Sequence, residues 1–353
     1  LLRLSNDPSM SALSYNLNVN GADANVVIPG IVGGQRVITS QGTINNVVKD
    51  LEVVYSVDAE SVSFHYGTHI GTGGLTMSNN TRVIGNVFSN STVSGSNSAF
   101  IENDVTISGN GNMLTGLHVG GNVLAHSCND SIIDGNLTYV QGGTNNCTVS
   151  GTTTIQSAQI PSQPLPITQE QITTWKDEAT SGGVLGNTNL TGSQKMTLGP
   201  KKINGSLTLS NNAVLTLSGT VYVTGTIVIN NSAKIELSSS YGSLSGIILS
   251  DGVISPSNSS TLRGSGQPGS YLMLLSTNTS NSAIVVSNSA TAAIFYTTAG
   301  GVLASNSFSA KEVTAHKLIM VNGATVTYES GLQNVLFSSG PSSGWKVSSW
   351  GEK

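Results

Sequence analysis

Charged side chains are scarce in this chain of 353 residues. Asp, Glu, Lys and Arg make up 9% of it, against roughly 25% in an ordinary globular domain. The net charge is −4 and there is no basic cluster, so the sequence lacks the electrostatic footprint expected for binding nucleic acid. No apolar run approaches the roughly 18 residues of a membrane span. Cysteine is also rare, with two residues.

Asn, Ser, Thr and Gly supply the polarity that charge does not. Hydrophobic residues still make up 37% of the chain, beside 41 glycines, so enough apolar material is present for a buried core. Asn, Ser and Thr tolerate tight turns and stack in like-on-like ladders, whereas charges stacked at strand spacing would repel one another. This composition favours an exported, extracellular protein of the cell surface.

A short phrase recurs between residues 82 and 157. Its copies are Gly85-Asn86-Val87, Asn103-Asp104-Val105, Gly121-Asn122-Val123, Gly135-Asn136-Leu137 and Gly151-Thr152-Thr153. Their central residues are 18, 18, 14 and 16 positions apart. Such a period holds two or three short strands but not a strand plus a helix. Coils of this kind bury their apolar side only by stacking, at about 4.8 Å per coil. The pattern predicts a right-handed parallel β-helix, with Asn86, Asp104, Asn122 and Asn136 stacked as a polar ladder.

The same strand pattern returns from Ile203 onward, with corners such as Asn230-Asn231-Ser232-Ala233 and Ser287-Asn288-Ser289-Ala290. Its period also lies between 16 and 19 residues, so both arrays are assigned to one architecture. Residues 272–275 and 293–296 lack alternation, which indicates buried strands. Trp345 and Trp350 are expected to cap the last open coil.

Residues between the arrays carry Pro161, Pro164 and Pro166, followed by a helix predicted over 168–180. Thr168 is its expected N-cap and Gln171 occupies the capping-box position. Trp175 is expected to pin this helix to the side of the solenoid.

The first 63 residues are expected to form a small antiparallel sheet, over about 13 to 58, behind the last turn of a helix at residues 1–4. Asn20-Gly21 and Gly33-Gly34 are the expected hairpin turns. The predicted organisation is therefore an N-terminal segment (1–63), a first array (64–158), a Pro-rich insertion (159–200), and a second array with a C-terminal cap (201–353).

Several of these residues carry a family resemblance. The opening Leu1-Leu2-Arg3-Leu4, then Arg36-Val37-Ile38-Thr39-Ser40 and Leu51-Glu52-Val53, resemble the segment after the N-terminal helix in minor-pilin-like proteins of type IV pilus systems. Downstream phrases such as Gly85-Asn86-Val87 and Tyr222-Val223 are similar to bacterial surface proteins with a β-helical body. The resemblance implies export and pilus assembly, with membrane contact only through a helix preceding Leu1.

Cys128 and Cys147 are 19 residues apart, close to one coil, so they could lie in neighbouring coils. Their positions relative to the recurring phrase differ by three residues, unless a corner bulge absorbs the difference. A disulfide and two buried free thiols both remain open.

His65 and His69 have the spacing of a helical metal pair, but Gly67 and the aromatic neighbours favour strand and loop, so both are interpreted as structural. Calcium could bind near Asp130 and Asp134. No metal or cofactor site is predicted.

Many parallel β-helices cleave acidic polysaccharides, which requires convergent carboxylates and a base. The best set of residues for such chemistry is Arg82, Glu102, Asp104, His126, Asp130 and Asp134. Asp104 shares a column with Asn86 and Asn122, so it is interpreted as a ladder member, and catalysis is not expected.

The sequence thus predicts a non-enzymatic exported structural or adhesive protein, a subunit or tip component of a pilus-like surface filament. Its expected partners are further copies, other pilus-like subunits, or a glycan or surface ligand, and not nucleic acid. A glycan-binding or polysaccharide-cleaving β-helix protein is the alternative. A binding module should expose an aromatic groove, with the candidate residues Tyr222, Tyr241, Tyr271 and Tyr296.

Overall fold

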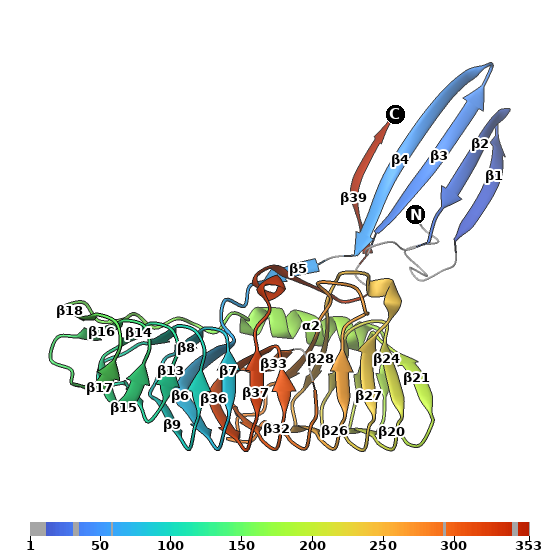
Figure 1. Cartoon of the computed structure of the whole chain (residues 1–353). Helices are drawn as coiled ribbons and strands as arrows, with labels where there is room; N and C mark the ends of the chain where they lie inside the picture. Colours follow the sequence, from blue (N-terminus) through green and yellow to red (C-terminus); the bar gives the residue numbers. More distant parts are fainter. Residues whose placement is uncertain (1–11, 31–34, 58, 292–293, 341–344, 353) are drawn as a thin grey trace.

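The computed structural model describes the chain except residues 1–11, 31–34, 58, 292–293, 341–344 and 353. A long stack of short parallel strands forms a β-helix, and an antiparallel sheet projects from its side (Figure 1). The predicted fold class, an all-β parallel solenoid with a small antiparallel sheet and one short helix, is confirmed. The expected helix turn at Leu1–Leu4 and the turn at Gly33-Gly34 lie outside the described residues.

Each coil of the β-helix contributes to three parallel sheets, named here faces 1, 2 and 3. From one end of the body to the other, face 1 consists of β19 (Val184–Leu185), β22 (Lys201–Ile203), β25 (Val221–Val223), β28 (Gly246–Ser250), β31 (Leu272–Ser276), β33 (Ile294–Thr297), the first part of β36 (Glu312–Val321), the first part of β6 (Thr68–Ser78), β8 (Val87–Ser89), β11 (Val105–Ile107), β14 (Val123–Ala125), β16 (Leu137–Val140) and β18 (Thr153–Gln156).

Faces 2 and 3 follow the same order. Face 2 consists of β20 (Thr188–Leu190), β23 (Leu207–Leu209), β26 (Ile227–Ile229), β29 (Ile254–Pro256), β32 (Ile284–Val286), β34 (Gly301–Ala304), the second parts of β36 and β6, β9 (Val93–Ser96), β12 (Met113–Thr115), and the first parts of β15 (Ser127–Ile133) and β17 (Asn145–Val149). Face 3 consists of β21 (Lys195–Leu198), β24 (Val214–Leu217), β27 (Lys234–Leu237), β30 (Thr261–Arg263), β35 (Ser309–Ala310), β37 (Thr325–Thr327), β7 (Arg82–Ile84), β10 (Phe100–Ile101), β13 (His118–Val119), and the last parts of β15 and β17. Thr291 bridges β30 and β35.

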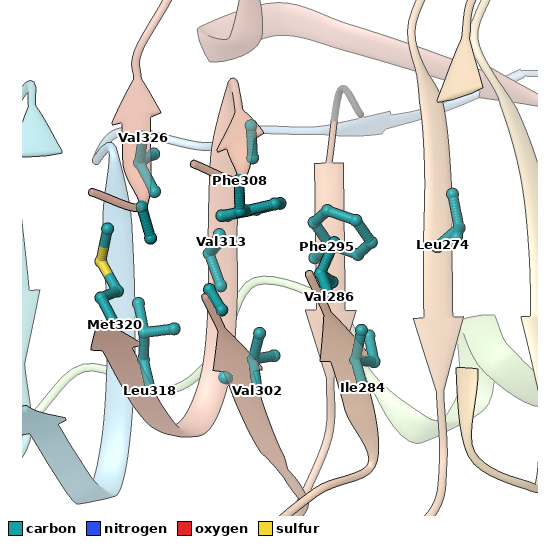
Figure 2. Close-up of a cluster of buried hydrophobic side chains, with 14 of the residues drawn as sticks. Leu274, Ile284, Val286, Phe295, Val302, Phe308, Val313, Leu318, Met320 and Val326 are labelled. Carbon is teal, nitrogen blue, oxygen red and sulfur yellow. The ribbon is translucent and has the colours of Figure 1, made fainter. Parts of the chain in front are cut away.

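Alternation along these short strands builds the core. In β23, Leu207 and Leu209 point inward and are fully buried, while Thr208 between them is half-buried on the outside. Repeating this pattern coil after coil lines up aliphatic side chains along the axis (Figure 2). One hydrophobic core therefore runs through both arrays.

The chain does not travel along this body from end to end. The first array starts in the middle, at β6, and runs outward to β18. Residues 157–183 then return along the side, and the second array starts at the opposite end, at β19, and runs back to the middle. There β36 pairs with β6 over eight residues, and β37 pairs with β7 over three. The two arrays thus meet at coils that lie far apart in the sequence.

The predicted helix is α2 (Gln169–Ser181), the one α-helix of the described residues. Thr168 Oγ1 accepts a hydrogen bond from Gln171 N at 3.2 Å, and Gln171 Oε1 accepts one from Thr168 N at 2.9 Å. This is the predicted capping box. Ile172 and Trp175 are buried against the outer side of face 1, as expected for Trp175.

The projecting sheet, named here the sheet module, has the strand order β1 (Leu13–Val19), β2 (Ala22–Ile28), β3 (Gln35–Ile44), β4 (Val47–Val57) and β39 (Trp345–Glu352). The cap predicted from Trp345 and Trp350 is wrong, because both belong to β39, which pairs antiparallel with β4. The entire β-helix is therefore inserted between two neighbouring strands of the sheet module. At the insertion point β5 (Ala59–Val62) pairs with β38 (Val335–Ser338). Two short 3-10 helices, Ser239–Tyr241 and Ser330–Asn334, complete the described elements.

Candidate functional site

The predicted polar ladder stands at the corner that leads into face 1. Asn86 Oδ1 accepts a hydrogen bond from the backbone N of Asp104 at 3.2 Å. Asp104 Oδ1 accepts from Asn122 N at 2.7 Å, and Asn122 Oδ1 accepts from Asn136 N at 3.0 Å. Asn136 Oδ1 continues the column to Thr152 N at 2.8 Å. Each side chain thus satisfies a backbone donor of the next coil, which gives these residues a structural role.

A second ladder, named here the corner ladder, crosses both arrays. In the order given below, each member after the first donates Nδ2–H to the side-chain oxygen of the member before it, at 2.9–3.1 Å. Its members are Asn211, Asn231, Asn258, Asn288, Asn306, Asn322, Asn79 and Asn97. All eight have positive φ, as do the residues that follow them, a conformation that Asn, Ser and Gly tolerate better than β-branched residues. The bond from Asn79 to Asn322 carries the ladder over the junction of the arrays.

Of the six residues considered for polysaccharide cleavage, Arg82 and Asp130 line one groove, and the set as a whole does not converge. Asp104 belongs to the polar ladder. His126 is buried on its own, with Nδ1 3.1 Å from Ser127 Oγ. Arg82 and Asp134 lie on face 3, but three coils separate β7 from the end of β15, about 14 Å at about 4.8 Å per coil. Glu102 is exposed at the corner after β10.

A shallow groove does occur on face 3 of the first array. Its floor is a column of outward-pointing residues in successive coils, Arg82, Phe100, His118, Ile132 and Thr148. The Arg82 guanidinium lies 5.2 Å from the Phe100 ring centroid, and the His118 ring meets Phe100 edge-on at 5.0 Å. His118 Nε2 lies 3.0 Å from Asp134 Oδ2, and Asp130 lines the rim.

The groove forms where the corner ladder ends. Beyond Asn97 the next corner contains Gly116, with φ +68°, and a Cβ there would overlap the carbonyl oxygen of Gly95. Leu117 packs against Gly95, where an added Cβ would overlap it. This corner therefore lies close against the preceding coil, and Ser98, Gly116, Leu117 and Asp130 line the hollow. Sequence reasoning named Arg82 and Asp130 but missed Phe100 and His118, although residues 82, 100 and 118 follow one another at 18-residue intervals.

The four tyrosines suggested for an exposed aromatic groove are all buried. Tyr222, Tyr271 and Tyr296 lie on the outer side of face 1, in the cluster with α2, and Tyr241 packs into the core. Burial and the neighbouring Asp251 raise the pKa of Tyr222 to about 12. An aromatic binding groove at these residues is therefore wrong.

His69 is buried between Tyr66 and Phe88, and His65 is exposed. Burial lowers the pKa of His69 to about 4, so the ring is neutral at pH 7. Among the residues that the structure describes, no group of three or more His, Cys, Asp or Glu side chains could hold a metal ion.

The two cysteines form a disulfide that ties the last coil of the first array to the coil before it. The Cα atoms of Cys128 and Cys147 are 5.8 Å apart. Cys128 pairs with Asn145, and the register of β15 on β17 shifts between Asn129 and Ile132. The shift accounts for one of the three residues of offset seen in the sequence, and the other two remain because Asn145, the partner of Cys128, lies two residues before Cys147.

The fold and its sites define a parallel β-helix protein with an antiparallel sheet module. No protein-family model matches the chain, and no curated protein matches it. Among solved structures, the competence-associated pilin ComZ from Thermus thermophilus is similar with a TM-score of 0.27 and 11% identity, over 98% of this chain and 87% of that chain. So low a TM-score gives no support for a shared function, and the resemblance to minor-pilin-like proteins stays a prediction. No helix among the described residues has the length and apolar character needed to cross a membrane.

Proposed function

We propose that this chain is a non-enzymatic, exported structural and adhesive protein, part of a pilus-like filament at the cell surface. In this proposal the β-helix is the display body and the sheet module is its mount. The observation that carries it is the insertion of the whole body between β4 and β39. In this arrangement the sheet module attaches the protein, and the β-helix carries the displayed surface.

Two further features support this proposal. The disulfide between Cys128 and Cys147 suits an oxidising compartment outside the cytosol. The corner ladder holds the coils together through uncharged asparagine side chains, whose hydrogen bonds are not screened by salt as ion pairs are.

Export is tested by labelling cells that produce the full-length protein with an antibody, before and after lysis. Comparable labelling of intact and lysed cells is the expected result. Labelling that appears only after lysis would overturn the proposal. Adhesion is then measured as retention of protein-coated beads on cell, mucin and polysaccharide surfaces, with albumin-coated beads as the control.

A second candidate function, glycan binding, is favoured by the groove on face 3. It combines an aromatic ring with cationic, anionic and amide side chains, the mixture that fixes polar ligands in shallow sites. A glycan microarray probed with the wild-type chain and with the Arg82→Ala/His118→Ala variant tests it. Binding that the double substitution leaves unchanged would argue against this groove.

A further inference from the structure

Both ends of the β-helix present unpaired strands in the described part of the chain. At one end, named here end A, β17 and β18 pair only with the preceding coils, through β15 and β16. At the other, end B, β19, β20 and β21 pair only with the following coils, through β22, β23 and β24. Free backbone N–H and C=O groups at such edges are templates for pairing with another chain.

Side chains at interior positions are uncovered at both ends. Ile155 follows Ala125 and Tyr139 in an inward-pointing column of face 1, in which Ala125 is fully buried, yet Ile155 is 58% exposed. At end B, Leu185 and Met196 line an open hollow, while their neighbours one coil inward are fully buried. Those buried neighbours are Ile203 and Leu215.

The two ends are complementary. Every pairing on the three faces is parallel, so end B of one molecule offers the edge that would come next after end A of another. Residues 145–156 at end A contain no ionisable group apart from the disulfide-bonded Cys147, and residues 184–198 at end B contain only Lys195. Lys195 stands in the outward column of Val214, so its charge does not enter the interior.

The centre of the molecule already contains a junction of this kind. The second array, ending at β37, and the first array, starting at β6, are not connected through their abutting coils, yet they stack in register. Backbone hydrogen bonds cross this junction from Arg82 N to Ala324 O at 3.0 Å and from Gly323 N to Asn79 O at 2.9 Å. The side-chain bond from Asn79 to Asn322, at 2.9 Å, crosses it as well. Two separate coil stacks of this sequence therefore form a continuous β-helix when their ends meet.

We infer that end A of one molecule docks on end B of a second copy, extending the β-helix into a linear filament. This deepens the proposed structural function and rests on it. The contact joins two different surfaces and involves no closing rotation, so it propagates without limit. Face 1 has thirteen levels from β19 to β18, which gives about 62 Å at about 4.8 Å per level. One sheet module should therefore project from the filament about every 62 Å.

The test uses the purified full-length chain in a concentration series, followed by sedimentation velocity and negative-stain microscopy. Ile155→Asp places a charge at end A, and Met196→Asp places one at end B. Ile44→Asp is the matched control, because Ile44 is 47% exposed and lies in β3 of the sheet module, outside the groove and both ends. Unfolding temperature checks that each variant is folded, and Thr153→Asp replaces Ile155→Asp if that variant fails.

The wild type and Ile44→Asp should form linear oligomers with the 62 Å repeat, and each end variant should associate at least about tenfold more weakly, since it would bury an unpaired charge. An equimolar mixture of the two end variants should yield dimers, since each keeps one intact end of the opposite kind. A wild type that stays monomeric, oligomers that survive the Ile155→Asp/Met196→Asp double substitution, or an equal loss with Ile44→Asp would each overturn the inference. Surface labelling that persists in such a case would show that only the docking, and not the exported role, had failed.

Discussion

Face 1 is covered in the second array and open in the outer coils of the first, beyond β8, where the outward residue Phe88 is still buried. In the second array its outward residues, such as Leu249 and Leu275, are buried beneath α2 and the segments around it, so β28 and β31 are apolar on both sides. In the first array the same positions hold residues such as Thr106 and Thr138, which are half-buried, and the strands alternate. The difference teaches that loss of alternation marks where a solenoid face has received a second layer.

The largest loss of stability is expected from replacing Trp175, which anchors α2 on face 1. Trp175 is buried and its ring centroid lies 6.2 Å from that of Phe337. Trp175→Ala should cost about 3–5 kcal/mol of unfolding free energy, with hydrogen exchange increasing in β25 and β28 first. Trp350→Ala is the control, because Trp350 is 75% exposed, and it should change stability by less than about 0.5 kcal/mol. Similar losses for both would contradict the anchoring role.

The first array, whose face 1 lacks α2, has the disulfide instead. Replacing Cys128 and Cys147 by Ser removes a cross-link over 19 residues and should cost about 2–4 kcal/mol. The loss should concentrate in β17 and β18, measured by hydrogen exchange with and without a reductant. Faster exchange in the second array would show that the two arrays do not differ in this way.

The junction of the arrays contains a buried acid. Glu312 is fully buried, Thr314 Oγ1 donates to its Oε1 at 2.6 Å, and Oε2 has no hydrogen-bond partner among the described residues. Burial raises the pKa of Glu312 well above 4.5. In the unfolded chain the group ionises near that value, so the free energy of unfolding should fall as pH rises from there to the folded pKa.

Glu312→Gln should remove this dependence. We expect the variant to be more stable than the wild type at pH 8 and to lose most of that advantage at pH 4, as measured by denaturant unfolding at both pH values. If the variant is more stable than the wild type by the same amount at pH 4 and pH 8, Glu312 is not protonated in the folded protein.

The smallest losses of stability are expected from substitutions in the corner ladder. Asn288 bonds to ladder neighbours on both sides, whereas Asn97 stands at the end and bonds only to Asn79 within the ladder. Asn288→Gly keeps the positive φ but removes two side-chain bonds, at about 0.5–1.5 kcal/mol each. Asn97→Gly removes one and should cost about half as much in chemical denaturation. Equal costs would mean that the ladder bonds do not act individually.

Local features of the fold could be predicted because they recur at fixed spacing. The column from Asn86 to Asn122 and the capping box at Thr168 are set by residues close in sequence or one coil apart. The order of the coils could not be predicted, because the same corner spacing fits stacking in either sequence. Only the pairing of β36 with β6 reveals the route.

The sheet module and the candidate site also contain features that the local sequence does not predict. Alternation in residues 345–350 is compatible with a strand, but nothing local indicates that its partner is β4, nearly 300 residues earlier. The recurring corners at Asn231 and Asn288 could be predicted from their spacing, but the ladder of side-chain hydrogen bonds along them could not. Beside the groove, Gly116 lies so close to Gly95 of the preceding coil that a Cβ would overlap its carbonyl oxygen, a contact that the sequence of one coil does not reveal.

The insertion of the body between β4 and β39 has a mechanical consequence. Two strands, β5 and β38, pair side by side where the chain enters and leaves the body. A body held by one strand could swivel about it, whereas a paired attachment resists torque and divides any tension between two backbones. A pull on the displayed surface would thus reach the sheet module with its direction preserved.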